Sequence, residues 1–155
     1  MLPTVIQKPI FSLFKLVFIL VLMTSSVLAE NAQTHDASPD IFVNHTVPQT
    51  DFSLSELRAI FAMRKTLWSD HSRIRVFVLE DNAAQHRLFT KNRLGMFPHQ
   101  LRRIWDKLTF SGTGNAPVKV DNMTEMQEKL ANTPGAIGYL SMKPAHSDIR
   151  MIHHE

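Results

Sequence analysis

The chain has 155 residues, with 17 lysines and arginines, 14 aspartates and glutamates and no cysteine. The lack of cysteine excludes thiol catalysis, zinc–thiolate sites and iron–sulfur clusters. Because two of the lysines lie near the N-terminus, the rest of the chain is close to neutral, and the basic balance gives no reason to expect nucleic acid as a partner.

The N-terminal 29 residues have the pattern of a secretory signal peptide. Lys8 and Lys15 give a positive start, residues 16–23 are an unbroken apolar run, and small residues at 27–29 precede Glu30. The alternative is a membrane anchor, but the apolar run is shorter than the roughly 18 to 20 residues that span a bilayer. We therefore expect export to the periplasm, with the signal peptide cleaved after residue 29.

We expect two further regions after the signal peptide. Residues 30–40 are polar and are predicted to be a flexible leader. Residues 41–152 are long enough for one domain with its own core. Without disulfides, packing alone has to stabilise this exported domain.

The first elements of the domain are a strand at residues 41–44 and a helix that follows Ser53. Ser53 and Glu56 have the spacing of a capping box, and Phe52 and Leu57 that of a hydrophobic staple. The apolar spacing predicts that one face of this helix is buried. Its members are Leu54, Leu57, Ile60 and Phe61.

A run of β-branched and aromatic residues at 74–79 predicts a central strand that is covered on both faces. Asp81 or Asn82 is placed to cap the next helix, and Gln85 to close a capping box on Asn82. Gly95 is a suitable residue to end that helix.

The strongest amphipathic pattern predicts a helix with Pro98 in its first turn. Arg102 and Arg103 are predicted to lie on its solvated face. Its apolar stripe consists of Phe97, Leu101, Ile104, Trp105 and Leu108.

A glycine-bearing loop at residues 110–117 leads to a short strand at 118–120. Asn122 together with Glu125 is predicted to cap the last helix. Because strands alternate with helices, we expect an α/β layered domain.

Residues 133–140 are the most distinctive segment of the chain. Pro134 ends the preceding helix, and Gly135 and Gly138 allow backbones to approach closely, so a tight turn and a buried strand at 136–140 are predicted. Residues 149–152 are predicted to form an edge strand.

Three segments, at residues 54–61, 110–117 and 133–140, resemble the phosphate-transporter substrate-binding proteins, which have the type 2 periplasmic binding-protein fold. The resemblance covers roughly residues 41–140 and leaves room for one lobe only. It implies an α/β fold consisting of a single lobe of a type 2 periplasmic binding protein, with a central, mostly parallel sheet flanked by helices.

In that family, as the resemblance implies, the strand matching residues 74–79 ends in an arginine, then an aspartate, then a Ser-Gly-Thr step that opens a helix. This chain has Leu79 at the arginine position and Asp81 at the aspartate position, and the step reads Ala83, Ala84, Gln85. The implied ligand is phosphate or another small oxyanion.

Two segments are candidates for binding that anion. The backbone N–H groups of Asn82 to Gln85 open a helix, with His86 and Arg87 in its first turn, and the alternative is an ordinary capped helix. Ser111, Gly112 and Thr113 resemble an anion-cradling loop, and the alternative is an ordinary glycine turn. The candidate residues are Asp81, Asn82, Ala83, Gln85, Ser111, Gly112 and Thr113.

No catalytic constellation, cofactor motif or metal-ligand spacing is present in the sequence. His146, His153 and His154 are interpreted as incidental histidines of a polar tail. We therefore expect a non-enzymatic, exported domain that resembles solute-binding proteins and has a membrane transporter or another periplasmic protein as partner. The alternative is a periplasmic protein-interaction module that has lost ligand binding.

Overall fold

The computed structural model describes residues 38–154, so the predicted signal peptide and most of the predicted leader lie outside the described residues. Strand β1 begins at Asp40, one residue before the predicted start of the domain. Within the described part, no helix is both long enough and apolar enough to cross a membrane.

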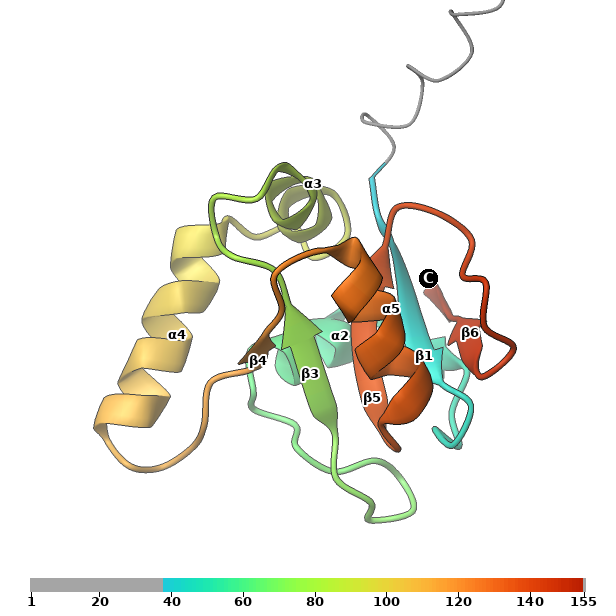
Figure 1. Ribbon diagram of the computed structural model, residues 1–155. Coiled ribbons are helices and arrows are strands. Elements are labelled where there is room, and N and C mark those ends of the chain that lie inside the picture. Colours follow the sequence, from blue (N-terminus) through green and yellow to red (C-terminus); the bar gives the residue numbers. More distant parts are fainter. Residues whose placement is uncertain (1–37, 155) are drawn as a thin grey trace, which may run out of the picture. The chain divides into compact units, whose positions relative to one another are not determined.

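Five strands form the central sheet in the order β4-β3-β5-β1-β6 (Figure 1). β3 is parallel to β4 and β5, whereas β1 is antiparallel to β5 and β6, so β1 alone runs against the other four strands. The strands are β1 (Asp40–Asn44), β3 (Arg75–Val78), β4 (Val118–Lys119), β5 (Ala136–Leu140) and β6 (Ile149–Met151). The mostly parallel sheet and the predicted edge strand are thereby confirmed, and a second small sheet pairs β2 (Asp51–Phe52) with β7 (His153–His154).

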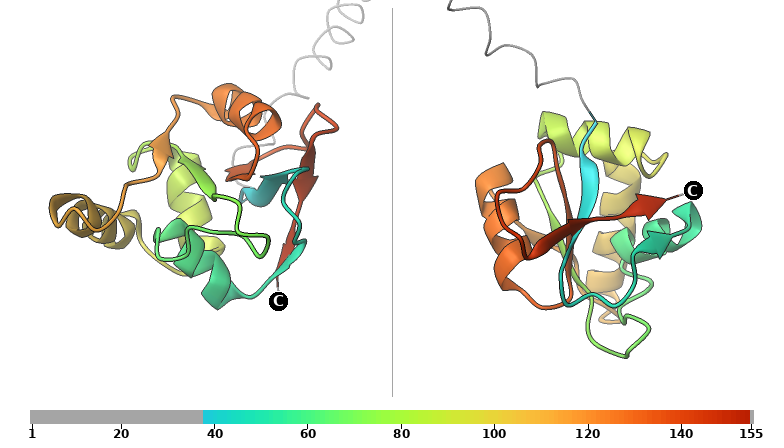
Figure 2. Two further views of the ribbon diagram at one scale, coloured as in Figure 1. Left: turned by 90° about the horizontal axis from the view of Figure 1, so that it is seen from below. Right: turned by 90° about the vertical axis from the view of Figure 1, so that its right-hand side faces the viewer.

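Residues 38–154 contain four helices: α2 (Leu54–Phe61), α3 (Ala84–Asn92), α4 (Pro98–Phe110) and α5 (Met123–Asn132). Figures 1 and 2 show α5 on one face of the sheet and α2 and α3 on the other. Two adjacent residues of β5 illustrate this division. Gly138 lies against Met126 and Leu130 of α5, and Tyr139 stacks on Phe89 of α3 with ring centroids 4.0 Å apart.

β5 is the centre of the core, and all five of its residues are buried. Gly135, just before the strand, has φ +73°, and a Cβ atom there would lie 2.4 Å from the carbonyl oxygen of Arg73. A Cβ atom on Gly138 would lie 2.7 Å from Met126 Sδ. The predicted close approach of backbones is therefore confirmed at Gly135, whereas at Gly138 the closest atom belongs to the side chain of Met126 and the nearest backbone atom, Phe77 O, lies at an ordinary contact distance of 3.5 Å.

Two of the predicted helix caps form. Ser53 Oγ accepts the N–H of Glu56 at 3.2 Å, and Asn122 Oδ1 accepts the N–H of Glu125 at 3.0 Å. The other hydrogen bond of the predicted capping box, from the Ser53 backbone N–H to the Glu56 carboxylate, does not form. That carboxylate accepts hydrogen bonds from Gln49 and Lys65 instead.

The predicted starts of α3 and α4 need correction. The N-cap residue of α3 is Ala83, and neither Asp81 nor Asn82 caps this helix. Phe97 was predicted to lie in the apolar stripe of α4, but it is the N-cap residue and its side chain is 54% exposed. It lies outside the core because the helix begins one residue after it.

Candidate functional site

The two predicted anion-binding segments lie at opposite ends of the lobe. Asp81 to Gln85 follow the carboxyl end of β3, whereas Ser111 to Thr113 come before the start of β4, which is parallel to β3. Between them α4 runs back along the sheet (Figure 1), and its 13 residues span about 20 Å. The two segments therefore cannot form one site.

The backbone donors of the second segment are already engaged at the end of α4. The N–H groups of Ser111, Gly112 and Thr113 donate to carbonyls of the last helical turn at 3.0 to 3.1 Å. Ser111 Oγ also donates to Lys107 O at 2.7 Å. A helix C-terminus carries a partial negative charge, which repels anions. We therefore place the candidate site at the other segment.

The start of α3 presents free backbone donors. Ala84, Gln85 and His86 are its first three residues, whose N–H groups have no partner within a helix. No side chain caps this end of α3, and Asn82 and Ala84 are exposed. Free N–H groups and the partial positive charge of a helix N-terminus together favour an anion.

The Asp81 carboxylate is paired with a side chain of α4, because the Arg102 guanidinium binds both of its oxygens. Arg102 Nε lies 2.8 Å from Oδ2 and Nη2 lies 2.7 Å from Oδ1. This hydrogen-bonded pairing lowers the pKa of Asp81 and raises that of Arg102. The guanidinium also lies over the ring of Trp105, 5.1 Å from its centroid. The predicted solvated face fits Arg103, which is exposed, whereas the Arg102 side chain is part-buried in its pair with Asp81.

Beneath the site, three buried groups share hydrogen bonds. The Leu79 N–H donates to the Tyr139 hydroxyl oxygen at 2.8 Å, and that hydroxyl lies 2.7 Å from His86 Nδ1. Either the hydroxyl donates to Nδ1 or Nδ1–H donates to the hydroxyl oxygen, depending on the tautomer of His86. Nε2 has no hydrogen-bond partner among the described residues and lies 4.0 Å from Asp81 Oδ1.

Burial sets the charge state of this cluster. The His86 side chain has no exposed area, and its burial lowers the pKa of His86 to about 4. Burial likewise raises the pKa of Tyr139. Both side chains are neutral at ordinary pH. The charges at this end of the sheet are those of Asp81, Arg102 and Arg87, together with an exposed ion pair in which Lys119 Nζ lies 2.8 Å from Glu80 Oε1.

The side chains beside the helix start differ from the expectation. His86 was predicted to assist an anion from the first turn of the helix, but it points into the core. Arg87 is exposed, and its guanidinium donates to Asn82 O at the mouth of the site. Leu79, at the position where the family pattern has arginine, is buried. No pattern in the sequence points to the hydrogen bonds that the buried Tyr139 hydroxyl makes with Leu79 and His86.

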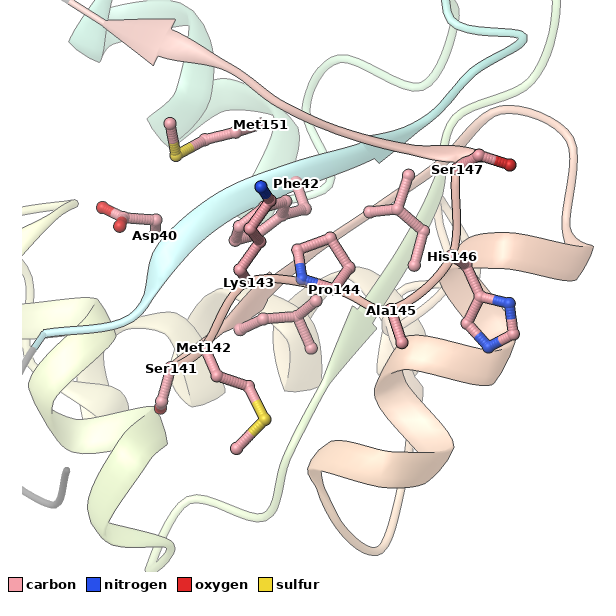
Figure 3. Close-up of a pocket in the computed structure, with 12 residues that line it drawn as sticks. Asp40, Phe42, Ser141, Met142, Lys143, Pro144, Ala145, His146, Ser147 and Met151 are labelled. Carbon is pink, nitrogen blue, oxygen red and sulfur yellow. The ribbon is translucent and has the colours of Figure 1, made fainter.

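A separate cavity of about 780 Å³ lies beside β1 and β6, and none of the predicted anion-binding residues lines it. Figure 3 shows the side chains of the segment 141–147 near Phe42 of β1. Its lining is mostly apolar and includes Leu140, Met142, Pro144, Ile149 and Met151. Over residues 38–154, no group of three or more histidines, aspartates and glutamates is placed to hold a metal ion.

Three solved structures are similar to this chain. An ABC-type phosphate transport receptor from Vibrio cholerae matches with a TM-score of 0.53 at 15% identity. A putative phosphate ABC transporter substrate-binding protein from Clostridium perfringens, solved with bound phosphate, matches with 0.59 at 15%, and PstS from Borrelia burgdorferi with 0.51 at 12%. Each match covers 76% of this chain but only 46%, 45% and 47% of the other chain, respectively. The fold is that of one lobe of a periplasmic binding protein.

The similarity of this chain to the three solved proteins is one of fold. The lobe spans less than half the length of the three solved proteins, and at this identity the similarity carries no residue roles. No protein-family model and no curated protein matches the sequence. The predicted resemblance to phosphate-transporter substrate-binding proteins is thus confirmed for the fold alone.

Proposed function

We propose that this chain is an exported, non-enzymatic domain that resembles solute-binding proteins and binds phosphate or a similar small oxyanion weakly. The observation that carries the proposal is the uncapped start of α3 at the carboxyl end of β3. Ligands of open α/β sheets bind outside the carboxyl ends of the strands, where helix N-termini point at them.

Several features of the site limit the affinity. Leu79 is buried, and Ala83 and Gln85 stand where the family pattern has serine and threonine, so the corresponding charged contacts are missing. Each charge-assisted hydrogen bond contributes roughly 1.5 to 3 kcal/mol. A single lobe also leaves the ion open to water and salt on one side. We therefore expect a phosphate affinity no better than about the millimolar range, near −4 kcal/mol.

Isothermal titration of the purified protein with phosphate, and separately with sulfate, tests this proposal. The matched variant is Ala84→Pro, which removes one N–H donor at the first helical position, where proline is well tolerated. Ala83 before it has φ −64° and ψ 133°, which suits a residue that precedes proline. We expect Ala84→Pro to keep its melting temperature and to bind phosphate more weakly than the unmodified protein.

The alternative function is a periplasmic protein-interaction module without a ligand. It is favoured by the Arg102 guanidinium, which already binds both oxygens of Asp81 and so satisfies the carboxylate internally. If titration detects no phosphate or sulfate binding, the interaction module is the better proposal. If phosphate binds in the micromolar range, the argument for weak binding is wrong and a transport role is favoured.

Export is tested on its own. We propose cleavage after Ala29, because the small residues at 27–29 follow the apolar run. Mass spectrometry of the protein recovered from the periplasm should find Glu30 as the new N-terminus. Recovery of the uncleaved chain from the membrane fraction would contradict the proposal.

A further inference from the structure

A second polar surface lies at the opposite end of the lobe, where β3 and β4 begin. Two depressions of about 510 and 480 Å³ meet there and share Arg73, Arg75 and Val118 in their linings. One lies on the α5 side, beside Gly135, and the other reaches Met63 near the end of α2. We call this surface the Arg73–Arg75 groove.

The arginines of the groove carry uncompensated charge. Arg73 and Arg75 are exposed, and among the described residues neither has a carboxylate within 4.0 Å or a side-chain hydrogen bond. Arg75 is the first residue of β3, and Arg73, two residues before it, forms an isolated β-bridge with Leu67; both arginines line both depressions. The nearby Asp70 carboxylate accepts hydrogen bonds from Ser72.

The groove also has apolar surface and an open strand edge. Leu67 and Val118 are 44% and 47% exposed. β4 is the last strand on its side of the sheet, and no described strand pairs with its outer edge. Because the Val120 N–H donates inward to Val78 O, the alternating pattern turns the N–H and C=O of Lys119 outward.

We propose that the Arg73–Arg75 groove binds an acidic segment of another protein, in extended conformation along the outer edge of β4. The backbone of the segment would pair with Lys119, an apolar side chain would cover Val118, and carboxylates would pair with the two arginines. The distance between Arg75 and Val118 along the strands fits such a segment. Arg75 precedes Phe77, the partner of Val118, by two residues, or about 7 Å. A carboxylate and an apolar side chain two residues apart in an extended segment have the same separation.

A short fluorescein-labelled peptide of alternating glutamate and valine is the probe, and a lysine–valine peptide of equal length is its control. Fluorescence anisotropy with the purified protein should show saturable binding of the acidic peptide only. Arg73→Gln with Arg75→Gln should weaken it at least about tenfold. Lys119→Pro, tolerated on an edge strand, should weaken it more than Lys119→Gln, because both variants remove the ion pair with Glu80 but only proline removes the outward N–H. The control Arg103→Gln, on the exposed side of α4, should bind like the unmodified protein.

The two tryptophans report where the probe binds. Trp68 Nε1 donates to the Gly135 carbonyl beside the groove, whereas Trp105 lies next to Arg102 at the oxyanion site. In ¹⁵N NMR spectra the acidic peptide should shift the indole signal of Trp68, and phosphate that of Trp105. Failure of phosphate to bind would leave the peptide result unaffected, so the two proposals are tested separately.

Three results would each overturn the inference. The first is equal binding of the lysine peptide, or binding that the arginine variants do not change. The second is a peptide-induced shift at Trp105 with none at Trp68. The third is self-association of the unmodified protein in ultracentrifugation that the arginine variants abolish, because the groove would then bind a second copy of this chain.

Discussion

The substitution Tyr139→Phe tests the buried cluster beneath the candidate site. It removes the hydroxyl that accepts the Leu79 N–H at 2.8 Å and lies 2.7 Å from His86 Nδ1. The phenyl ring can keep its stacking on Phe89, so no cavity forms. Two buried polar groups lose their partner, and each such loss costs about 1 to 3 kcal/mol. We expect the free energy of unfolding to fall by about 2 to 6 kcal/mol, a large part of a typical 5 to 15 kcal/mol.

Urea denaturation followed by circular dichroism measures this loss. The control is a double-mutant cycle with His86→Leu, which removes Nδ1. In the double variant only the Leu79 N–H is left without its partner. The two losses should then be less than additive, with a coupling energy of about 1 kcal/mol. A loss below about 0.5 kcal/mol for Tyr139→Phe would show that these hydrogen bonds do not stabilise the fold in the way described.

Three further predictions concern stability. Because the pKa of His86 falls from 6.5 to about 4 on folding, the unfolded chain takes up the proton first as the pH falls. Stability should therefore be highest above about pH 6.5 and drop by about 3 kcal/mol toward pH 4, and urea melts of His86→Gln should lack this component. Trp105→Ala removes a buried ring whose Nε1 donates to Phe61 O at 2.9 Å, and calorimetry should show a loss of about 3 to 5 kcal/mol. Ser53→Ala should cost about 1 kcal/mol in thermal melts through loss of the α2 cap.

The features that could be predicted from the sequence depend on neighbours in the chain. The caps at Ser53 and Asn122 form because donor and acceptor are three residues apart. The turn into β5 was predictable because Gly135 marks a close backbone contact whichever residue makes it, here Arg73. Alternation of strands and helices then limits the architecture to a few layered folds.

The features that could not be predicted join distant parts of the chain. Asp81 pairs with Arg102, which is 21 residues away, and His86 with Tyr139, 53 residues away. Capping propensity suggested that Asp81 or Asn82 would cap α3, but the Asp81 carboxylate has a stronger partner in the guanidinium of Arg102. The spacing of apolar residues also does not show which helix packs on which face of the sheet. The contact of His86 with Tyr139 of β5, and with it the burial of His86, could therefore not be predicted.

The Asp81–Arg102 pair bears on both proposed roles of the lobe. A free carboxylate beside the start of α3 would repel an anion, and two charges at 4 Å interact by about 4 kcal/mol near a protein surface. By binding both carboxylate oxygens, Arg102 removes most of that repulsion, and the helix N-terminus stays usable for an oxyanion. Because Asp81 and Arg102 bind each other, however, neither of them is left as a charged partner for a ligand. In the Arg73–Arg75 groove the arginines have no such carboxylate partner in the described part of the chain. The stronger electrostatic attraction is therefore expected at the end of the lobe opposite α3, for a partner that brings its own carboxylates.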